Sequence, residues 1–381
     1  MFRNLLNPQT ISELEKAFES SPGGFLVVEQ GLPRFAVLDY ETYQRLKNQP
    51  QARQPRPGRI LVTGGAGYIG SVTARLLLDR GYEVVILDQN RTSRLACLPE
   101  CQFIQGDLMD RALLDKIFSE QPIESVIHFA ASVEVEESVQ NPGKYFQNNV
   151  VTGLQLLDAM VEHGVKSIIF SSSAAVYGEP SRQPIPEETL CQPTNPYGAS
   201  KLMFEQILQW YQEAFGLQSV SLRYFNAGGA WPEAGLGYSL GEGETHLLPR
   251  VLDVAAGRNS EIKVFGQDYE TPDGTCIRDF VHVRDLAEAH LLALQKLERE
   301  RGAYTYNVGT GLGHSVLEVI DTAVEVTGRM IAMQYAARRP GDPAKLIADS
   351  SKLKKDLAWQ PKYDLRAILE SSWQWVRQNK K

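Results

Sequence analysis

The feature that most constrains the fold is a glycine-rich turn between two apolar segments. The run "RILVT" (59–63) leads directly into "GGAGYIG" (64–70). Residues 71–81 then have helical spacing, and "YEVVILD" (82–88) forms a second apolar run. A buried strand, a glycine turn, a helix and another buried strand in this order are typical of a parallel βαβ unit.

Further apolar runs alternate with helical segments along the chain. The runs are "SVIHFAA", "KSIIFSSS", "SVSLRYFN" and "AYTYNVG", and the helical segments cover 111–119, 150–163 and 200–215. We find no internal repeat of fixed period. Because strands and helices of this length alternate, we predict an α/β protein with a Rossmann-like, doubly wound parallel sheet covered on both faces.

The glycine turn has the spacing of a dinucleotide-binding loop. Gly65, Gly67 and Gly70 fit G-x-G-x-x-G, and Gly64 starts the related spacing G-x-x-G-x-x-G. Such a loop lets the backbone approach a pyrophosphate, which the following helix start binds through its N–H groups. Asp88 ends the next apolar run, where a carboxylate accepts from an adenosine ribose and repels a 2′-phosphate. The structural alternatives are a plain glycine turn and a solvated carboxylate. The order of elements favours bound NAD over NADP.

The stretch "NPYGASK" places a phenol and an ammonium one helical turn apart. Asn195 is a good N-cap and Pro196 a good first helical residue, so Tyr197 and Lys201 fall on one helix face. A free tyrosine has a pKa near 10 and is a poor base at neutral pH. We expect the ammonium, together with the positive nicotinamide ring of NAD+, to lower the pKa of Tyr197. The structural alternative is a surface contact between the two side chains.

A serine-rich segment at the end of an apolar run supplies a third partner. Open α/β sheets bind ligands at the carboxyl ends of their strands, and "FSSSAAVYG" (170–178) lies at such an end. Ser173 is therefore placed to hydrogen-bond the substrate oxygen that Tyr197 deprotonates. The alternative, a turn that only caps the strand, fits Ser171 and Ser172 better than Ser173.

Composition excludes several classes of function. The 381 residues, 43% of them hydrophobic, suffice for a sizeable core, and the net charge of −7 disfavours binding to nucleic acid or anionic membranes. No apolar run reaches the roughly 18 residues that span a bilayer, and residues 1–16 do not have the pattern of a secretory signal. The four cysteines match no zinc or redox spacing. We expect a soluble cytoplasmic protein with free thiols and no metal.

Taken together, these motifs resemble a known enzyme family. "TGGAGYIG", Asp88, "HFAA", "SSSAAVYG" and the Tyr-x-x-x-Lys pair resemble the extended short-chain dehydrogenase/reductases. More narrowly, "RYFNAGGA", "GETHLLPRVL", "VFGQDYETPDGTCIRDFVHVRDLAEAH", "YNVGTG" and "RRPGD" are similar to the UDP-glucose 4-epimerase family over about residues 59–378. The resemblance implies an NAD-binding domain over 59–235 and a smaller α/β domain over 236–381 that mainly binds a UDP-sugar, with some segments returning to the first.

The resemblance also implies roles for individual residues. The catalytic set is Tyr197, Lys201 and Ser173. The residues implied to contact NAD, with Asp107 near the adenine, are Gly64, Gly67, Tyr68, Ile69, Gly70, Asp88, Asp107, Leu108, Phe129, Ala130, Asn148, Tyr197, Lys201 and Phe225. The residues implied to hold the UDP-sugar are Ser173, Asn226, His246, Leu247, Arg278, Arg339 and Asp342. Two arginines suit a diphosphate through forked, charge-assisted hydrogen bonds; surface salt bridges are the alternative for Arg339 and Asp342.

The chain departs from the family pattern at three places. Residues 135–138 read "VEES" where many relatives have "VGES" or "VPES", and Val133 stands where some relatives carry a lysine. These changes leave the cofactor contacts of that loop open. Leu346 stands where some relatives have tyrosine and others cysteine, which leaves acceptance of N-acetylated sugars open.

The implied reaction interconverts UDP-galactose and UDP-glucose. C4 of the sugar is oxidised with Tyr197 as the base, the 4-keto sugar turns over, and C4 is reduced on its other face. UDP-GlcNAc, UDP-glucuronate and UDP-pentoses are alternative substrates.

A 4,6-dehydratase is disfavoured, because Ala174 and Ala175 stand where that reaction needs an acid and a base. A binding protein with an inactive site is disfavoured because Tyr197, Lys201 and the glycine loop are all present. The family tends to form homodimers through two helices, one of them near 150–163.

The N-terminal segment is separate from this body. Residues 49–58, "QPQARQPRPG", form a proline-rich linker, so residues 1–48 are predicted to be a short α+β module. A helix, two short strands around 30–33 and a helix from about Asp39 resemble the Phd/YefM-type antitoxins. Seven basic and six acidic residues over 1–57 give a net charge of only +1, a weak footprint for DNA. We favour a structural appendage over a DNA- or protein-binding module.

Overall fold

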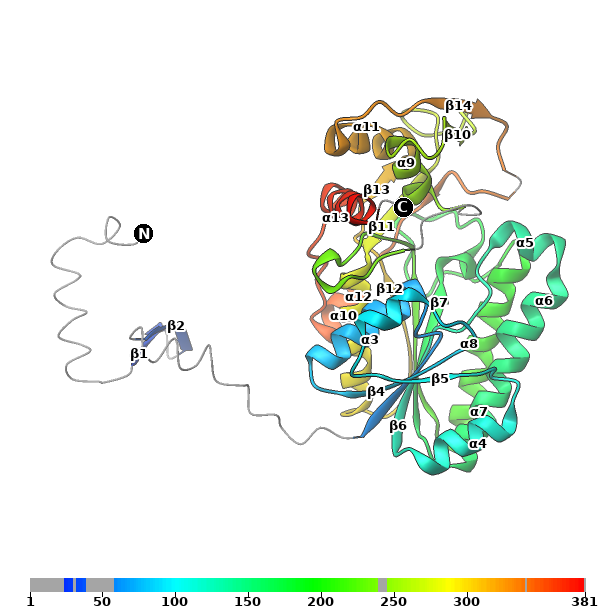
Figure 1. Cartoon of the computed structure of the whole chain (residues 1–381), viewed down its shortest axis with the longest axis vertical. Helices are drawn as coiled ribbons and strands as arrows, with labels where there is room; N and C mark the ends of the chain where they lie inside the picture. Colours follow the sequence, from blue (N-terminus) through cyan, green and yellow to red (C-terminus); the bar gives the residue numbers. More distant parts are fainter. Residues whose placement is uncertain (1–23, 30–31, 39–57, 239–244, 340, 380–381) are drawn as a thin grey trace. The chain divides into compact units, whose positions relative to one another are not determined.

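A computed structural model describes residues 24–29, 32–38, 58–238, 245–339 and 341–379. The chain divides into two compact units, Met1–Arg56 and Pro57–Lys381. The described part of the first unit is an antiparallel hairpin of β1 (Gly24–Glu29) and β2 (Leu32–Leu38), as Figure 1 shows. The two predicted strands are therefore present. The two helices predicted beside them lie outside the described residues.

The second unit is built on a parallel sheet of seven strands. Their order is β12-β8-β7-β6-β3-β4-β5, and every neighbouring pair is parallel. The strands are β3 (Arg59–Thr63), β4 (Glu83–Asp88), β5 (Gln102–Gln105), β6 (Ile123–His128), β7 (Ser167–Ser173), β8 (Gln218–Tyr224) and β12 (Ala303–Val308). The predicted class of fold is confirmed, and each predicted apolar run forms one of these strands.

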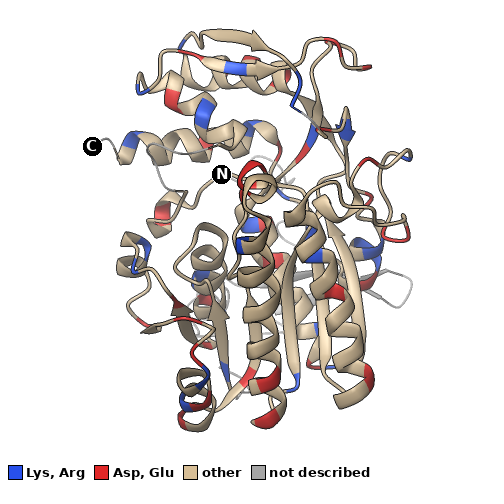
Figure 2. Ribbon diagram, turned by 90° about the vertical axis from the view of Figure 1, so that its right-hand side faces the viewer, with Lys and Arg blue, Asp and Glu red and all other residues tan. Residues whose placement is uncertain are grey.

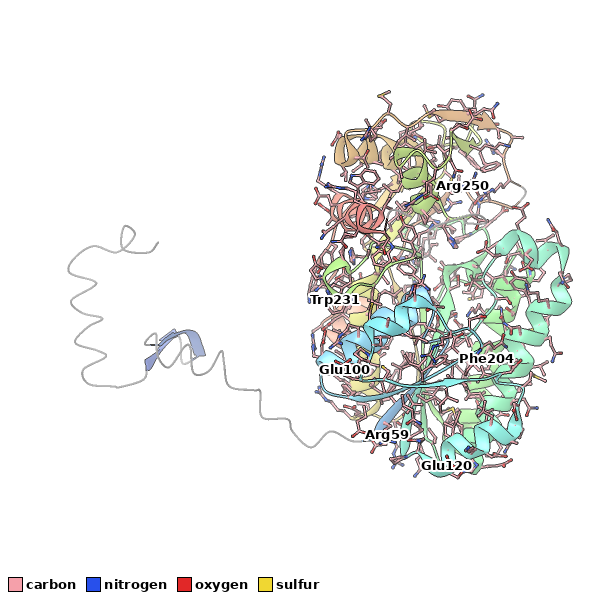
Figure 3. All side chains as sticks on the ribbon, viewed as in Figure 1. Arg59, Glu100, Glu120, Phe204, Trp231 and Arg250 are labelled. Carbon is pink, nitrogen blue, oxygen red and sulfur yellow. The ribbon has the colours of Figure 1, made fainter. Side chains whose placement is uncertain are left out.

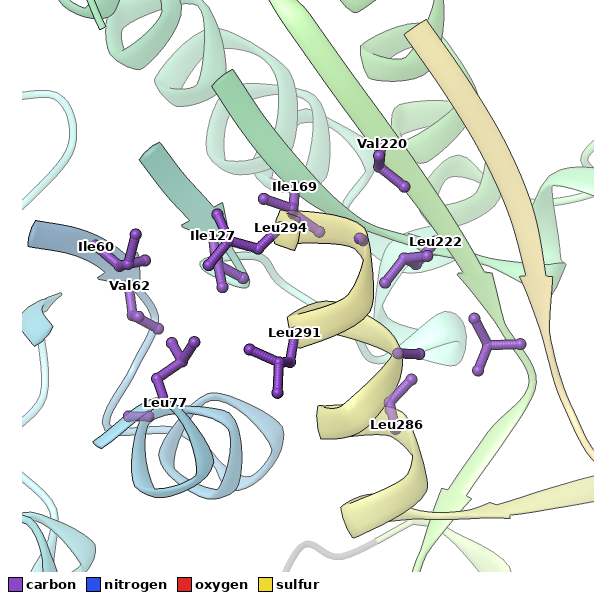
Figure 4. Packing of buried hydrophobic residues seen from close by; sticks show 14 of the residues in the cluster. Ile60, Val62, Leu77, Ile127, Ile169, Val220, Leu222, Leu286, Leu291 and Leu294 are labelled. Atoms are coloured by element: carbon purple, nitrogen blue, oxygen red, sulfur yellow. The ribbon is translucent and has the colours of Figure 1, made fainter. Parts of the chain in front are cut away.

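The sheet is covered on both faces because its strands are apolar at successive positions. Ile60 and Val62 pack in one core with α3 (Tyr68–Asp79) and α10 (Val283–Leu297) (Figure 4). Leu61, which points the other way, packs with the helices of the opposite face. Those helices are α4 (Arg111–Glu120), α7 (Thr152–Glu162) and α8 (Pro196–Phe215). Figure 3 marks Phe204 of α8, whose side chain is fully buried in this second core.

Short helical segments connect these elements. They are η1 (Ser93–Cys97), α5 (Val135–Gln140), α6 (Pro142–Phe146), η2 (Gln147–Val151), η3 (Ala174–Tyr177) and η4 (Pro232–Ala234). The predicted helix over 150–163 therefore begins inside η2, a π-helical turn, and continues as α7. The predicted helices over 111–119 and 200–215 correspond to α4 and α8, and α8 starts earlier, at the proline.

A second lobe of the same unit has its own core. Its helices are α9 (Leu247–Ala255), α11 (Val316–Thr327) and α13 (Leu365–Gln378), whereas α12 (Ser351–Leu357) packs on the core of the large sheet through Leu353. Its strands are β9 (Asn226–Gly228), β10 (Ile262–Phe265), β11 (Ile277–His282), β13 (Gly313–Ser315), β14 (Met333–Ala336) and β15 (Lys345–Leu346). β11 is central and pairs with β9, β13 and β15, whereas β10 pairs with β14. Among these helices α9, α11 and α13 share a hydrophobic cluster with β10 and β11. Acidic and basic residues are spread over both lobes (Figure 2).

The two lobes are interleaved in sequence. After the second lobe has begun with β9, the chain returns to the large sheet through α10 and β12 and then leaves again. Within the described residues, no helix is long and apolar enough to cross a membrane.

Candidate active site

A cavity of about 1270 Å³ opens between the large sheet and the second lobe; we call it the central cavity. It lies at the carboxyl ends of β3, β4, β6, β7 and β8, where open α/β sheets bind ligands. The predicted site residues that line it are Gly64, Gly67, Tyr68, Ile69, Gly70, Asp88, Leu108, Phe129, Ala130, Asn148, Ser173, Tyr197, Lys201, Phe225, Asn226, His246, Leu247, Arg278, Arg339 and Asp342. The structure thus brings almost the whole predicted set into one cavity.

Asp107 is the predicted residue that does not line the central cavity. Its carboxylate accepts a hydrogen bond from the Met109 N–H at 2.8 Å and so stabilises the turn before α4. The neighbouring Gly106 and Leu108 do line the cavity.

The glycines of the loop have different structural tasks. Gly64 has a φ of +70°, and a Cβ there would lie 2.6 Å from the Ala130 backbone N. A Cβ on Gly70 would lie 2.5 Å from the Gly64 carbonyl oxygen. Gly67 is less constrained, since a Cβ there would meet only that same oxygen, at 3.1 Å. Gly64 and Gly70 are therefore required by the turn itself, whereas Gly67 keeps the cavity open at the start of α3.

The start of α3 fits the pyrophosphate of a dinucleotide. Gly67 is the N-cap residue, so no side chain caps the helix, and the residues of the first turn line the cavity. N–H groups and positive partial charge at such a position favour an anion. Gly67 itself lines the cavity, so a side chain at this position would narrow it at the start of α3. These features agree with a bound NAD.

Asp88 lines the cavity at the end of β4 and also holds the loop. Its carboxylate accepts from the Ala66 N–H at 3.1 Å and from the Asn90 N–H at 2.9 Å. The carboxylate is therefore half-buried and held by the loop backbone, and its contact with a ribose stays a prediction. Arg94 also lines the cavity nearby, and its Nε donates to the Gly237 carbonyl at 2.7 Å. Sequence reasoning missed Arg94, which lies in the short helix η1 and carries no motif.

The catalytic helix begins as its sequence predicts. The Asn195 side chain accepts from the Gly198 N–H at 2.8 Å, and Pro196 is the first residue of α8. Tyr197 is 9% exposed and Lys201 3%, so the alternative of a surface contact is wrong. Lys201 Nζ lies 5.8 Å from the centre of the Tyr197 ring and donates to the Ser171 carbonyl oxygen at 2.8 Å.

Ser173 meets the phenol from the end of β7. Its hydroxyl accepts from the Ala175 N–H at 3.2 Å, and Ser173 lowers the pKa of the Tyr197 phenol. The backbone contact holds the serine Oγ at the end of β7, and both Ser173 and Tyr197 line the cavity. Tyr197, Lys201 and Ser173 therefore form one cluster on the cavity wall.

The pKa values in this cluster differ from the expectation. Burial raises the pKa of Tyr197 and the carboxylate of Glu134 raises it further, while the hydrogen bond from Ser173 lowers it. Burial lowers the pKa of Lys201 to about 7, although Glu205 acts in the opposite direction. The protein's own groups thus keep the phenol protonated. The expected phenolate requires another positive charge beside it, such as the nicotinamide ring of NAD+.

The far wall of the cavity is cationic. Arg278 forms an ion pair with Asp342, and the Arg339 guanidinium stacks 4.1 Å from the centre of the Phe265 ring. Lys263 also lines the cavity on this side. Asp342 therefore forms a salt bridge, but this pair lines the cavity and is not a surface pair, and the role of Asp342 toward the substrate stays a prediction. The two arginines lie where a diphosphate would find forked donors.

His246 and Leu247 reach the cavity as the N-cap and first residue of α9. Glu134 and Thr245 also line the cavity, and sequence reasoning gave them no role. They lie 111 residues apart in the sequence, so no local pattern predicts that they meet. No group of side chains able to hold a metal ion occurs in the ranges that the structure describes.

The comparisons with known proteins agree with this geometry. Residues 60–309 match the model of the NAD dependent epimerase/dehydratase family, and the chain belongs to this family. It is similar to the UDP-glucose 4-epimerase of Halalkalibacterium halodurans, with 49% identity over 84% of this chain and 96% of the relative. The UDP-glucose 4-epimerase of Bacillus subtilis is 46% identical over 84% of this chain and 97% of that relative.

Solved structures are similar over the same region. UDP-glucose 4-epimerase from Bifidobacterium longum, in complex with NAD+ and UDP, has 43% identity and a TM-score of 0.80 over 84% of this chain and 98% of that one. MoeE5, in complex with UDP-glucuronic acid and NAD, has 29% identity and a TM-score of 0.74 over 85% and 100%.

Proposed function

We propose that this chain interconverts UDP-galactose and UDP-glucose by inverting the configuration at C4, with NAD as its cofactor. The observation that carries the proposal is the meeting of three features in one cavity. The uncapped start of α3, the cluster of Tyr197, Lys201 and Ser173, and the wall with Arg278 and Arg339 all line it. The relatives named UDP-glucose 4-epimerase support this substrate.

Each wall of the cavity has a distinct task in this reaction. NAD, when bound, takes up and returns the hydrogen of C4. The start of α3 binds its pyrophosphate and Asp88 its ribose. Tyr197 removes the proton from the 4-hydroxyl and gives it back, while Ser173 donates a hydrogen bond to the same oxygen. Lys201 orients the nicotinamide ribose and, in its protonated form, adds positive charge beside the phenol.

The cationic wall anchors the UDP end while the sugar turns over. Arg278 and Arg339 bind the diphosphate, and Asp342 holds Arg278 in place through its ion pair. Asn226, His246 and Leu247 contact the nucleotide from β9 and the start of α9. We therefore assign residues 59–235 mainly to NAD and residues 236–381 mainly to the UDP-sugar, with α10 and β12 returning to the sheet.

Turnover of UDP-galactose by the purified full-length chain tests the proposal. Formation of UDP-glucose without added NAD is expected, because NAD is regenerated in each cycle and need not leave. Tyr197→Phe is expected to abolish turnover. The matched control is Tyr211→Phe on the same helix, whose partly buried ring packs against the core and does not line the cavity. A wild-type chain that fails to form UDP-glucose, with or without added NAD, would overturn the proposal.

We also infer that the enzyme is a cytoplasmic homodimer that pairs through α7 and α8. Met203 is 44% exposed and Trp210 68% exposed, and their spacing of seven places both on one face of α8. Large apolar side chains exposed in a row on a helix suit a second helix. Light scattering is expected to give twice the chain mass, and Trp210→Glu to give the single mass; a wild-type monomer would contradict the inference.

For residues 1–48 we propose an antitoxin-like appendage with a structural role. The hairpin of β1 and β2 agrees with this resemblance. A DNA gel shift of the full-length chain that weakens with salt would overturn the structural role. The absence of a shift, with a change in chain mass or stability when residues 1–57 are deleted, is the expected result.

A further inference from the structure

Glu134 places a carboxylate at the catalytic end of the central cavity. It is half-buried, lines the cavity and is the N-cap residue of α5. Its backbone carbonyl accepts a hydrogen bond from the hydroxyl of Tyr145 at 2.5 Å, and Tyr145 is fully buried. The backbone of Glu134 is therefore fixed by the core and not only by its own loop.

The Glu134 side chain is held across the cavity mouth. Its Oε2 accepts a hydrogen bond from Thr245 Oγ1 at 2.5 Å. Thr245 immediately precedes His246, the N-cap of α9, so the contact joins the loop after β6 to the second lobe. Both residues line the cavity. The carboxylate thus stays at this position and does not swing into solvent.

Within the part of the chain that the structure describes, the negative charge of Glu134 has no partner cation. Among the ion pairs of the described residues, none includes Glu134. Glu134 lies in the loop after β6, and β6 pairs with β7, the strand that ends at Ser173. Its negative charge also raises the pKa of the Tyr197 phenol. Glu136, two residues further along in the first turn of α5, adds a second carboxylate to the cavity lining. The cavity therefore has an acidic rim at Tyr197 and a cationic wall at Arg278.

The substrate must lie between these two ends. With its diphosphate at the arginines and its 4-hydroxyl at Tyr197, the sugar has C6 only two bonds from C4. A carboxylate at C6 would therefore lie in the same half of the cavity as Glu134. Two negative charges a few Å apart repel strongly where water is partly excluded. A neutral CH₂OH group at C6 meets no such repulsion.

We infer that Glu134 excludes UDP-sugars with a carboxylate at C6, so that this site takes neutral UDP-hexoses and rejects UDP-glucuronate. The inference rests on the proposed function, since it assumes that the sugar lies at Tyr197. The fold itself does not exclude uronates, because MoeE5 is solved with UDP-glucuronic acid. The discrimination must then come from individual side chains, and Glu134 is a charged residue that lines the cavity beside the carboxyl end of β6.

The test measures the dissociation constants of UDP-glucose and UDP-glucuronate for the full-length holoenzyme by competition. Glu134→Gln removes the charge but keeps an oxygen for the Thr245 hydroxyl. The matched control is Glu137→Gln, also on α5, whose carboxylate contacts Lys144 and Tyr145 and does not line the cavity. Wild type is expected to bind UDP-glucose roughly tenfold or more tightly than UDP-glucuronate. Glu134→Gln should reduce this ratio about fivefold or more, and Glu137→Gln should leave it within about twofold.

Two results would overturn the inference. One is equal affinity of the wild type for the two nucleotides, and the other is an unchanged ratio in Glu134→Gln. The ratio of the two dissociation constants does not change when a variant is only less stable, whereas an activity does. Because the readout is binding, it is separate from the proposed reaction. A charge-dependent ratio in a chain without turnover would support the role of Glu134 while it contradicts the proposed function.

Discussion

Arg223 on β8 and Glu205 on α8 form a forked ion pair between the sheet and the catalytic helix. Arg223 Nε lies 2.9 Å from Glu205 Oε1, and Arg223 Nη2 lies 2.5 Å from Glu205 Oε2. Ser172 donates to the same carboxylate at 2.5 Å, and Arg223 Nη1 donates to the Tyr177 hydroxyl at 3.0 Å. The pair therefore joins α8 to β7 and β8 one turn after Lys201, and it raises the pKa of the buried guanidinium.

Replacement of Arg223 by methionine is expected to destabilise the fold. The change leaves the Glu205 carboxylate buried without its partner, which costs about 3–5 kcal/mol of unfolding free energy. The double variant Glu205→Gln/Arg223→Met should be less destabilised than Arg223→Met alone, because no uncompensated charge remains. Chemical denaturation of the two variants measures both effects. A double variant that is less stable than the single one would show that the pair acts through packing and not through charge.

Substitutions in the glycine loop should separate folding from cofactor binding. Gly64→Ala forces a side chain into a left-handed conformation and against the Ala130 backbone, so a loss of about 2–4 kcal/mol in unfolding free energy is expected. Gly67→Ala has an ordinary backbone conformation, with φ −72°, and should fold nearly as well as wild type. Its Cβ projects toward the pyrophosphate position, so NAD affinity should fall roughly tenfold or more. Thermal unfolding and the NAD content of the purified protein measure the two effects.

Gly164→Ala serves as the control for that experiment. Gly164 also has a positive φ, of +74°, but a Cβ there meets no atom within 4 Å. A small loss of stability with normal NAD content is expected. Equal NAD loss in Gly67→Ala and Gly164→Ala would mean that the loop binds no dinucleotide.

Lys201 should make stability rise with pH. The unfolded lysine keeps its proton up to its ordinary pKa, whereas burial lowers the pKa in the folded protein to about 7. Between about pH 7 and pH 10 the unfolded state therefore binds more protons, and the unfolding free energy rises with pH by up to about 1.4 kcal/mol per unit. Lys201→Met has no titrating amine and should lack this slope. The difference in unfolding free energy by which Lys201→Met exceeds wild type should therefore shrink as the pH rises. Parallel curves for the two proteins would contradict the burial of a titrating lysine.

His290 should contribute to acid unfolding. Its Nδ1 contacts the Leu286 carbonyl oxygen at 2.8 Å, and burial lowers the pKa of the ring to about 4. Between about pH 6.5 and pH 4 the unfolded state takes up a proton that the folded state does not, so stability falls as the pH falls. His290→Leu should reduce this slope by up to about 1.4 kcal/mol per pH unit. Denaturation at pH 4.5, 5.5 and 6.5 measures it, and an unchanged slope would mean that the buried ring is already charged.

The sequence predicts the large sheet well because its strands are continuous apolar runs, and it predicts α8 because Asn195 and Pro196 mark the helix start. The second lobe is harder. Strands such as β13 and β15 have three and two residues, too few to show a period of two. These strands form only because β11 provides a partner.

The site was predicted where a motif marks it and missed where tertiary contacts create it. The roles of Tyr197 and Gly67 follow from local spacing. The Glu134–Thr245 contact joins distant segments, so a local pattern does not contain it. Burial raises the pKa of Tyr197, and the spacing of residues in the sequence does not show burial. The expected lowering of this pKa by Lys201 was therefore wrong for the protein without bound NAD+.

The position of β12 in the sheet has a consequence for biosynthesis. β8 is complete at Tyr224, but its neighbour β12 begins only at Ala303, and the 78 residues between them include much of the second lobe. At a translation rate of 5–20 residues per second, the exposed edge of β8 waits roughly 4 to 16 seconds for its partner strand. A nascent chain that stops before Val308 leaves the ribosome with an open sheet edge, to which another chain can add. The large sheet is therefore finished only after about half of the residues 236–381 have been synthesised.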